Sequence, residues 1–216
     1  EVCVGYDRRF LSDVAATWVS EVFAGNNKKV YFIDHAAPTP MIMYSVKERE
    51  LEYGMAITAS HNPAIYNGIK LFTYGGKDAT ETLTDALQIE IDAITEVKTS
   101  DFNQALNDHR IEIINPRNQY VDAVLSFLDL EAIKAADLKV IVDTMHGVSS
   151  TSLSMILNTA RIETEIINNR HDTLFGGKLP TPQSSTLHKL SDMVIAGKYD
   201  LGIATDGDAD RLGIID

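Results

Sequence analysis

The most distinctive chemistry in the sequence lies in the run Asp206-Gly-Asp-Ala-Asp-Arg211, near the end of the chain. Three carboxylates at alternate positions of a tight loop repel one another unless a cation lies between them. Oxygen ligands alone favour Mg²⁺ or Ca²⁺ over Zn²⁺. A solvated acidic turn is the other interpretation, because Asp and Gly are common turn residues. The position directly after an apolar strand, with Arg211 next, favours a metal site at Asp206, Asp208 and Asp210.

A second loop, TASHNP, places Ser60 and His61 after another apolar run. The small Ala59 leaves Ser60 approachable, but a serine needs activation before it can act as a nucleophile. Neighbouring side chains often point apart, so His61 is not assigned as its base and no Ser-His-Asp triad is predicted. An ordinary turn is an equally good interpretation of this loop, because Ser, Asn and Pro are turn residues.

A lysine follows shortly after the second loop. The pair Asn67-Gly68 predicts a tight turn between two strands, and this turn would hold Lys70 within reach of an anion at Ser60. A solvated surface lysine is the other interpretation. The same interpretation is favoured for Arg8, Arg9 and Lys178.

The elements that must position these loops are short strands alternating with longer helices. Apolar runs predict strands at residues 2–6, 29–33, 55–59, 69–74, 138–143, 162–167, 200–205 and 211–215. Helices are expected at 12–25, 39–53, 80–97, 119–136 (interrupted near Asp129), 148–160, and from Thr181-Pro182 to about Gly197.

Two of these helices have a predicted apolar face. It comprises Val14, Trp18, Val22 and Phe23 in the first helix, and Leu83, Leu87, Ile91 and Ile94 in the third. Residues 98–119 are polar and weakly patterned.

The two halves of the chain resemble each other. In each half a Pro-Thr-Pro run precedes a helix, and a strand and a polar loop follow, with Ser60 and Asp206 at equivalent places. The pattern predicts two similar three-layer α/β/α units with mostly parallel, mixed sheets. We expect domains at 1–115 and 116–216, with both loops just past the carboxyl ends of strands, where open α/β sheets bind ligands.

Composition excludes several classes of partner. The 216 residues include 31 acidic and 19 basic ones, for a net charge of −12, which disfavours nucleic acids and anionic membranes. No apolar run approaches the ~20 residues that span a bilayer. A single cysteine, Cys3, fits a reducing compartment, so we expect a cytoplasmic protein.

Because the chain lacks an initiator Met and ends on a strand, we expect a fragment of a longer polypeptide.

Together these loops resemble the α-D-phosphohexomutases, the phosphoglucomutase/phosphomannomutase family. The resemblance rests on five stretches in the expected order: VGYDRRFLS, GMAITASHNPAIYNGIKL, KVIVDTMHG, LPTP and DLGIATDGDADRLGI. It spans nearly the whole chain, and TASHNP followed later by DGDADR is a specific combination. It implies the first two of four domains, with the phosphoserine domain at 1–115 and the metal-loop domain at 116–216.

The resemblance also implies roles for single residues. Ser60 matches the serine that carries the phosphoryl group and gives Mg²⁺ one oxygen ligand; Asp206, Asp208 and Asp210 match the other protein ligands of this cofactor. Lys70 matches a candidate general acid/base. His61 and Arg211 match residues that line the reacting phosphate.

The implied reaction interconverts hexose 1-phosphate and hexose 6-phosphate, of glucose or mannose, through a hexose bisphosphate. An opening loop with glycine and arginine and the C-terminal domains of the family are absent from this sequence, and Gln183 stands where many members have Glu. We therefore expect this fragment to be inactive by itself. An Asp206-dependent phosphatase and a non-catalytic metal- or phosphosugar-binding module are the alternative functions.

Overall fold

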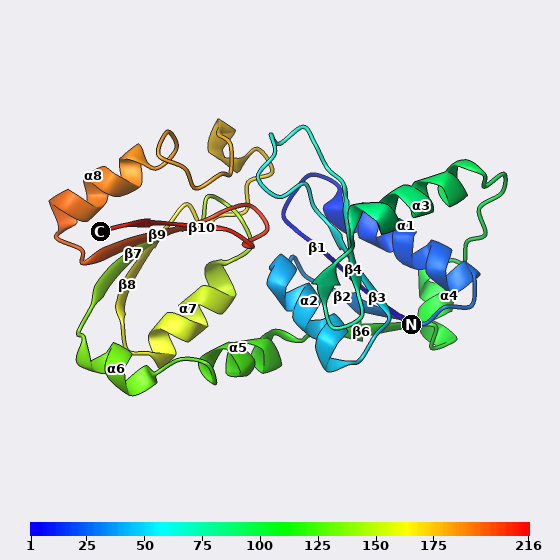
Figure 1. Cartoon of the computed structure of the whole chain (residues 1–216), viewed down its shortest axis with the longest axis horizontal. Helices are drawn as coiled ribbons and strands as arrows, with labels where there is room; N and C mark the ends of the chain where they lie inside the picture. Colours follow the sequence, from blue (N-terminus) through cyan, green and yellow to red (C-terminus); the bar gives the residue numbers. More distant parts are fainter. The chain divides into compact units, whose positions relative to one another are not determined.

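The computed structural model describes all residues from 1 to 216, which form two compact units (Figure 1). The first unit comprises Glu1–Tyr6, Leu11–Thr58 and Gly68–Pro116. The second comprises Arg117–Asp216 and two short segments that follow strands of the first unit, Asp7–Phe10 and Ala59–Asn67. None of the helices combines the length and the apolar character that crossing a membrane requires.

The first unit contains a six-stranded mixed sheet in the order β5-β4-β3-β1-β2-β6. The strands are β1 (Val2–Tyr6), β2 (Val30–Ile33), β3 (Tyr53–Ile57), β4 (Ile69–Thr73), β5 (Lys77–Asp78) and β6 (Ile111–Ile114). Strands β3, β1, β2 and β6 run parallel, whereas β4 and β5 are antiparallel additions at one edge. The parallel strands bring the ends of β1 and β3 to the same edge of the sheet.

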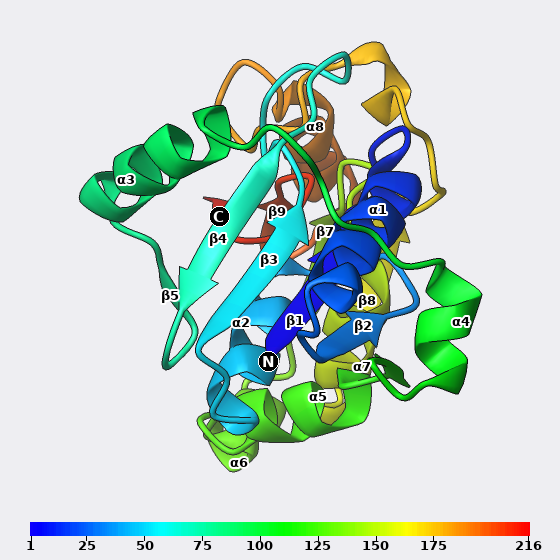
Figure 2. The same cartoon turned by 90° about the vertical axis from the view of Figure 1, so that its right-hand side faces the viewer.

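Four helices accompany this sheet: α1 (Ser12–Gly25), α2 (Thr39–Glu48), α3 (Glu81–Asp92) and α4 (Phe102–Asn107). Helices α1 and α4 share one apolar core with the strands, whereas α2 lies on the opposite face, where Ile42 and Val46 approach Gly5 and Gly54. Figure 2 shows α1 in front of the sheet and α2 behind it. The two glycines allow α2 to lie close to the strands, because a Cβ at either position would clash with these side chains.

The predicted apolar face of α1 is wrong in part, since Phe23 packs against the core but Trp18 does not. Its buried residues are the small ones at four-residue spacing, Ser12, Ala16, Ser20 and Ala24, whereas Trp18 is 59% exposed. Small side chains let the helix approach the sheet closely, and the Ser20 hydroxyl donates to the Ala16 carbonyl instead of remaining unsatisfied.

Helix α3 is shorter than the predicted 80–97, and none of its residues is buried. Leu87, Ile91 and Ile94 are exposed, so the predicted apolar face exists in the sequence but is not covered by the rest of the first unit. The side chain of Thr80 accepts a hydrogen bond from the Leu83 amide and caps the helix start, as its residue type favours.

Other boundaries also differ from expectation. Helix α2 ends at Glu48 rather than near Tyr53, because Glu50 is left-handed and β3 already pairs with β1 from Tyr53 onward. The weakly patterned stretch 98–119 contains α4, capped by Asp101, and edge strand β6. Asn67-Gly68 is not a two-residue hairpin turn, because β3 and β4 are joined by the whole loop 58–68.

The second unit contains a four-stranded sheet in the order β10-β9-β7-β8. Its strands are β7 (Lys139–Asp143), β8 (Glu163–Ile167), β9 (Leu201–Thr205) and the antiparallel β10 (Leu212–Ile215). Helix α8 (His188–Gly197) packs on one face through Leu190 and Val194, and α7 (Ser150–Thr159) on the other through Leu157 (Figure 1). Helices on both faces of a mostly parallel sheet in each unit confirm the predicted fold class.

The remaining helices of this unit are α5 (Arg117–Leu125), α6 (Leu130–Ala135) and a 3₁₀ turn at Phe175–Gly177. The predicted interruption near Asp129 is confirmed, since this residue caps α6 by accepting from the Ala132 amide. The predicted helix start at Thr181-Pro182 is wrong. The hydroxyl of Thr186 donates to the carbonyls of Thr181 and Gln183 and closes a turn there, so α8 begins only at His188.

Candidate active site

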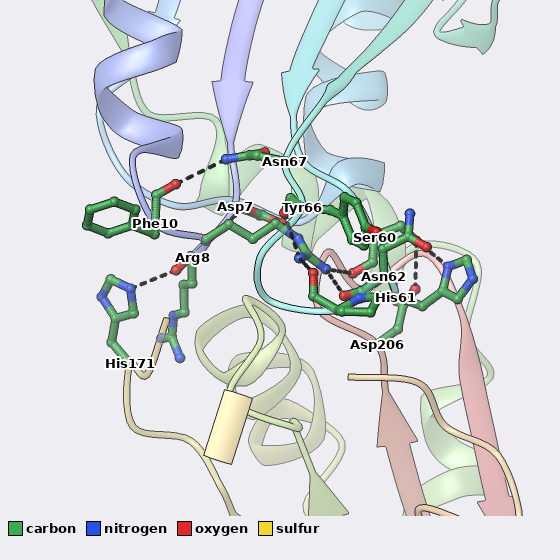
Figure 3. A network of polar contacts seen from close by, with 12 residues as sticks. Asp7, Arg8, Phe10, Ser60, His61, Asn62, Tyr66, Asn67, His171 and Asp206 are labelled. Carbon is green, nitrogen blue, oxygen red and sulfur yellow. Dashed lines mark hydrogen bonds and ion pairs between the residues drawn. The ribbon is translucent and has the colours of Figure 1, made fainter. Parts of the chain in front are cut away.

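The candidate site lies in the second unit, where three loops meet. Asp7–Phe10 and Ala59–Asn67 continue from the ends of β1 and β3, and the loop from Asp206 to Arg211 joins β9 to β10. The structure thereby brings Ser60, His61, Arg211 and the acidic loop together, as Figure 3 shows in part.

Ser60 occupies the centre of this arrangement. Its Oγ donates to Asp206 Oδ2 at 3.0 Å and accepts a hydrogen bond from Arg211 Nη2 at 3.0 Å. The residue is 5% exposed, and its φ of 52° lies in the left-handed region that non-glycine residues seldom adopt. Left-handed backbone at a buried serine is strain of the kind that clusters at functional sites.

The backbone around Ser60 is held by Arg9. This guanidinium donates to four carbonyls of the loop, those of Ser60 at 2.6 Å, Asn62 at 2.8 Å, and Pro63 and Tyr66 at 3.0 Å. Its Nε lies 3.3 Å from Asp7 Oδ2, and both side chains are almost completely buried, at 0% and 1% exposure. Burial lowers the pKa of Arg9, while Asp7 opposes this shift. The buried cation therefore fixes the loop that presents Ser60.

The predicted solvated character of Arg9 is wrong, and that of Arg8 is wrong in part. Arg8 is half-buried and donates to the Asn169 carbonyl at 2.9 Å. Sequence reasoning also passed over Asp7 as a partner of Arg9. The signal was available, because an acid two positions before a base, directly after a buried strand, can form such a local pair. Lys178 is exposed, as expected.

The acidic loop can hold a cation. One oxygen from each of Asp206, Asp208 and Asp210 lies within 4.8 Å of the others, and the first two residues are 0% exposed. Gly207 permits the close approach to the serine loop, since a Cβ there would lie 2.8 Å from the Ser60 carbonyl oxygen. Three carboxylates with a serine hydroxyl beside them form an all-oxygen donor set of the kind that Mg²⁺ prefers.

The electrostatics of the loop agree with this interpretation. Burial, together with repulsion from Asp208 and Asp210, raises the pKa of Asp206 from 3.8 to about 7. Hydrogen bonds from the Arg211 amide and Ser60 oppose the rise. A divalent cation would offset the same repulsion, because each carboxylate of the loop would then be attracted to the metal.

Arg211 and His61 form a second polar contact at this site. Arg211 Nη2 lies 2.6 Å from His61 Nδ1, and a guanidinium only donates, so Nδ1 accepts and the neutral ring carries its proton on Nε2. Nδ1 lies 3.5 Å from Ser60 Oγ, at the limit of a hydrogen bond. His61 is therefore placed to contact an anion through Nε2 rather than to remove the proton of Ser60.

Lys70 lies in β4 of the first unit, where it pairs in register with Ala56 of β3. Its role as an acid or base stays a prediction. Asp206 is a poor nucleophile in this arrangement, because it is fully buried, its Oδ1 accepts from the Asp210 and Arg211 amides, and its Oδ2 accepts from Ser60. This geometry counts against the phosphatase alternative.

Family comparisons match both halves of the chain. Residues 1–98 match the model of phosphoglucomutase/phosphomannomutase, alpha/beta/alpha domain I, and residues 118–216 match that of alpha/beta/alpha domain II. The chain belongs to the phosphoglucomutase/phosphomannomutase family. The resemblance inferred from the loops is thereby confirmed. The family is metal-dependent, and the cluster of Asp206, Asp208 and Asp210 could hold a metal.

Individual relatives of this chain support the same family assignment. A phosphoglucosamine/phosphogalactosamine mutase of Sulfurisphaera tokodaii is 31% identical over all of this chain and 47% of its own length. A phosphoglucomutase of Staphylococcus saprophyticus is 31% identical over all of this chain and 40% of its own. The crystal structure of a putative phosphomannomutase from Thermus thermophilus superposes with a TM-score of 0.86 at 29% identity, covering 99% of this chain and 48% of that one. The chain spans about half the length of the curated relatives it matches.

Proposed function

We propose that the whole protein is a phosphohexomutase that interconverts hexose 1-phosphate and hexose 6-phosphate through a phosphoserine at Ser60. The observation that carries this proposal is the strained, buried Ser60, hydrogen-bonded to Asp206 of the acidic loop and to the Arg211 cation. Three relatives with different named activities, a phosphoglucosamine/phosphogalactosamine mutase, a phosphoglucomutase and a putative phosphomannomutase, are all called mutases. Glucose and mannose phosphates are the proposed substrates.

The proposed cofactor is Mg²⁺, held by Asp206, Asp208, Asp210 and an oxygen on Ser60. When bound, it supplies charge neutralisation for the transferring phosphoryl group. The carboxyl of Asp206 must be ionised to bind it, and its raised pKa links metal binding to release of a proton.

The chain's own residues would then perform the remaining work. The P–O bond to Ser60 Oγ breaks as the hydroxyl oxygen of a hexose phosphate bonds to the same phosphorus, and the hydroxyl proton passes to Lys70 in its neutral form. The electron pair of the broken bond stays on Oγ as an alkoxide, which Arg211 Nη2 stabilises by a hydrogen bond until the second transfer. Arg211 and His61 Nε2 donate to the phosphoryl oxygens. After the bisphosphate reorients, its other phosphoryl group returns to Ser60, and Lys70 gives the proton back to the sugar oxygen. Arg9 keeps Ser60 in line by holding its carbonyl.

The decisive experiment is carried out on the full-length protein. Intact mass and peptide mapping should find one stable phosphate, on the peptide that contains Ser60. Ser60→Ala should lose both this phosphate and the Mg²⁺-dependent isomerisation of hexose phosphate, whereas Ser126→Ala, at an exposed helix end, should keep both. Full isomerase activity in the Ser60→Ala variant would refute the mechanism.

The alternatives predict different results. A phosphatase that uses Asp206 would lose activity in Asp206→Asn and keep it in Ser60→Ala. A non-catalytic module would show no isomerisation in the full-length protein at any Mg²⁺ concentration. Metal affinity is measured separately, because Asp208→Asn should weaken Mg²⁺ binding even where no turnover is detected.

A further inference from the structure

A groove in the second unit, apart from Ser60, is lined by basic side chains that the proposed mechanism does not use. Its inner part is a cavity of about 120 Å³ between the end of β7 and the loop around Phe175. Its outer part is a hollow of about 390 Å³ between the same loop and the start of α8. The two parts share four lining residues and form one groove: Lys178, Leu179, Thr186 and Lys189.

The charge of this groove is opposite to that of the chain. The side chains of Lys178 and Lys189 are exposed and make no ion pair or hydrogen bond with the rest of the chain, although the net charge is −12. His146 and His188 complete the basic lining. The one carboxylate in the lining, Asp143, is 5% exposed. Its oxygens accept hydrogen bonds from Asn168 Nδ2 and the Met145 amide, which partly offset its charge.

His146, at the inner end of the groove, has a defined ring orientation. Its Nδ1 lies 3.0 Å from the Arg170 carbonyl, which only accepts, so Nδ1 donates and Nε2 is left facing Gly176. Glycine is needed at this point, because a Cβ there would lie 2.9 Å from Nε2. Met145 and His146 are both left-handed, at φ of 47° and 62°, as are Phe175 and Gly176. Strained backbone on both walls of one cavity is typical of a ligand site.

The walls of the groove also contact the loops of the candidate active site. Phe175 is 2% exposed, and the Arg9 guanidinium lies 4.9 Å from the centre of its ring. Gly147, next to His146, lies against the carbonyl oxygens of Asp206 and Gly207, and the Val148 amide donates to the latter. A molecule in the inner cavity would therefore press on the residues that hold Ser60 and the acidic loop.

We propose that this groove binds a small phosphate monoester, with the phosphate held by Lys178 and Lys189, beside His146, in the inner cavity. The two ammonium groups are suited to a dianionic phosphate, since charge-assisted hydrogen bonds are the strong ones. The outer hollow receives the organic part, against Leu179 and the hydroxyl and amide groups of Ser185 and Gln183, which suits a polyhydroxy compound such as a sugar. The site is separate from the one at Ser60 and does not depend on the proposed reaction.

The test is a titration of the 216-residue chain with glucose 6-phosphate, followed by the backbone amide resonances in NMR. Amides of His146, Gly176, Lys178 and Lys189 should shift and saturate, and unphosphorylated glucose should leave them unchanged. The double variant Lys178→Ala/Lys189→Ala should weaken this binding about a hundredfold, at about tenfold for each lost charge-assisted contact. Both side chains are exposed, so the variant should fold. The matched control is Lys28→Ala/Lys98→Ala, which removes two exposed lysines elsewhere and should bind unchanged.

Three outcomes would overturn the proposal: shifts that persist in the double variant, no shift at millimolar ligand, or inorganic phosphate binding as tightly as glucose 6-phosphate. The last outcome would mean that the outer hollow recognises nothing. Shifts confined to the amides of residues 59–61 and 206–211 would count against this groove but not against the proposed function, because they report the site at Ser60.

Discussion

Replacement of Arg9 by methionine tests whether a buried cation holds the Ser60 loop. The substitution keeps much of the side-chain volume but removes the donors to four carbonyls, and it leaves Asp7 buried without its guanidinium. Removing one member of a buried ion pair costs about 3–5 kcal/mol, because the remaining charge is uncompensated. We expect a loss of this size in the free energy that keeps Ala59–Asn67 closed.

Hydrogen exchange with peptide-level mass analysis measures this quantity directly. The amides of Asn62 and Tyr66 are bonded within the loop, to the carbonyls of Ala59 and Pro63. A loss of about 3–5 kcal/mol accelerates their exchange about a hundredfold to several thousandfold, up to the limit set by global unfolding. Amides of β4, in the first unit, should keep their exchange rates.

Arg8→Met is the matched control, since it is the same substitution one position earlier. Arg8 makes one close contact, to the Asn169 carbonyl, so its loss should cost about 1 kcal/mol. The double variant Asp7→Asn/Arg9→Met should regain part of the stability, because the buried charge is gone. Unchanged exchange of Ala59–Asn67 in Arg9→Met, or an effect no larger than that of Arg8→Met, would refute the reasoning.

Three further predictions concern other parts of the chain. Because the pKa of Asp206 is raised to about 7, the folded metal-free chain holds a proton that the unfolded chain releases near pH 4. The melting temperature of the metal-free chain should thus fall as the pH rises from about 4 to 7. A melting temperature that does not change with pH would contradict this, as would an Asp206→Asn variant whose melting temperature falls just as steeply with pH. Mg²⁺ should bind more tightly as the pH rises, because Asp206 must lose its proton to become a ligand, and isothermal titration calorimetry can measure this. Weaker binding at about pH 8 than at about pH 6 would count against an ionised Asp206 ligand. Ile91→Ser in α3 should change the free energy of unfolding in urea by less than about 0.5 kcal/mol, because Ile91 is exposed. Leu157→Ala in α7 should cost about 2–4 kcal/mol, because Leu157 is buried. Equal losses would show that the apolar face of α3 is covered.

Much of the fold was predictable because its strands are continuous Val- and Ile-rich runs. Strands such as β1 and β7 depend on burial of their own side chains, which the sequence shows directly. The face of α1 was only partly predictable, since its fully buried residues are Ala and Ser, although Val19 and Phe23 also pack against the core. Likewise, α4 is short and its only strong local signal is the Asp101 cap, and β6 gains its order from pairing with β2.

The candidate site was likewise predictable only where its signal is local in the sequence. The spacing of Asp206, Asp208 and Asp210 is local, so their clustering could be predicted, and the structure places their oxygens together. Contacts between distant segments were not accessible. Nothing near Arg9 indicates that its guanidinium reaches carbonyls more than 50 positions later, and the tautomer of His61 depends on Arg211, 150 positions away.

The second unit is therefore assembled from segments that leave the ribosome at very different times. Ser60 precedes Asp206 by 146 positions, which is on the order of 10–30 s of synthesis. Arg9 and the Ser60 loop can associate early, as a preformed platform, whereas the acidic loop closes on it last. Bringing these ends together costs roughly 4 kcal/mol of loop entropy. A cation that binds only the closed form would offset this cost, so metal supply during translation would determine what fraction of newly made chains holds this unit closed.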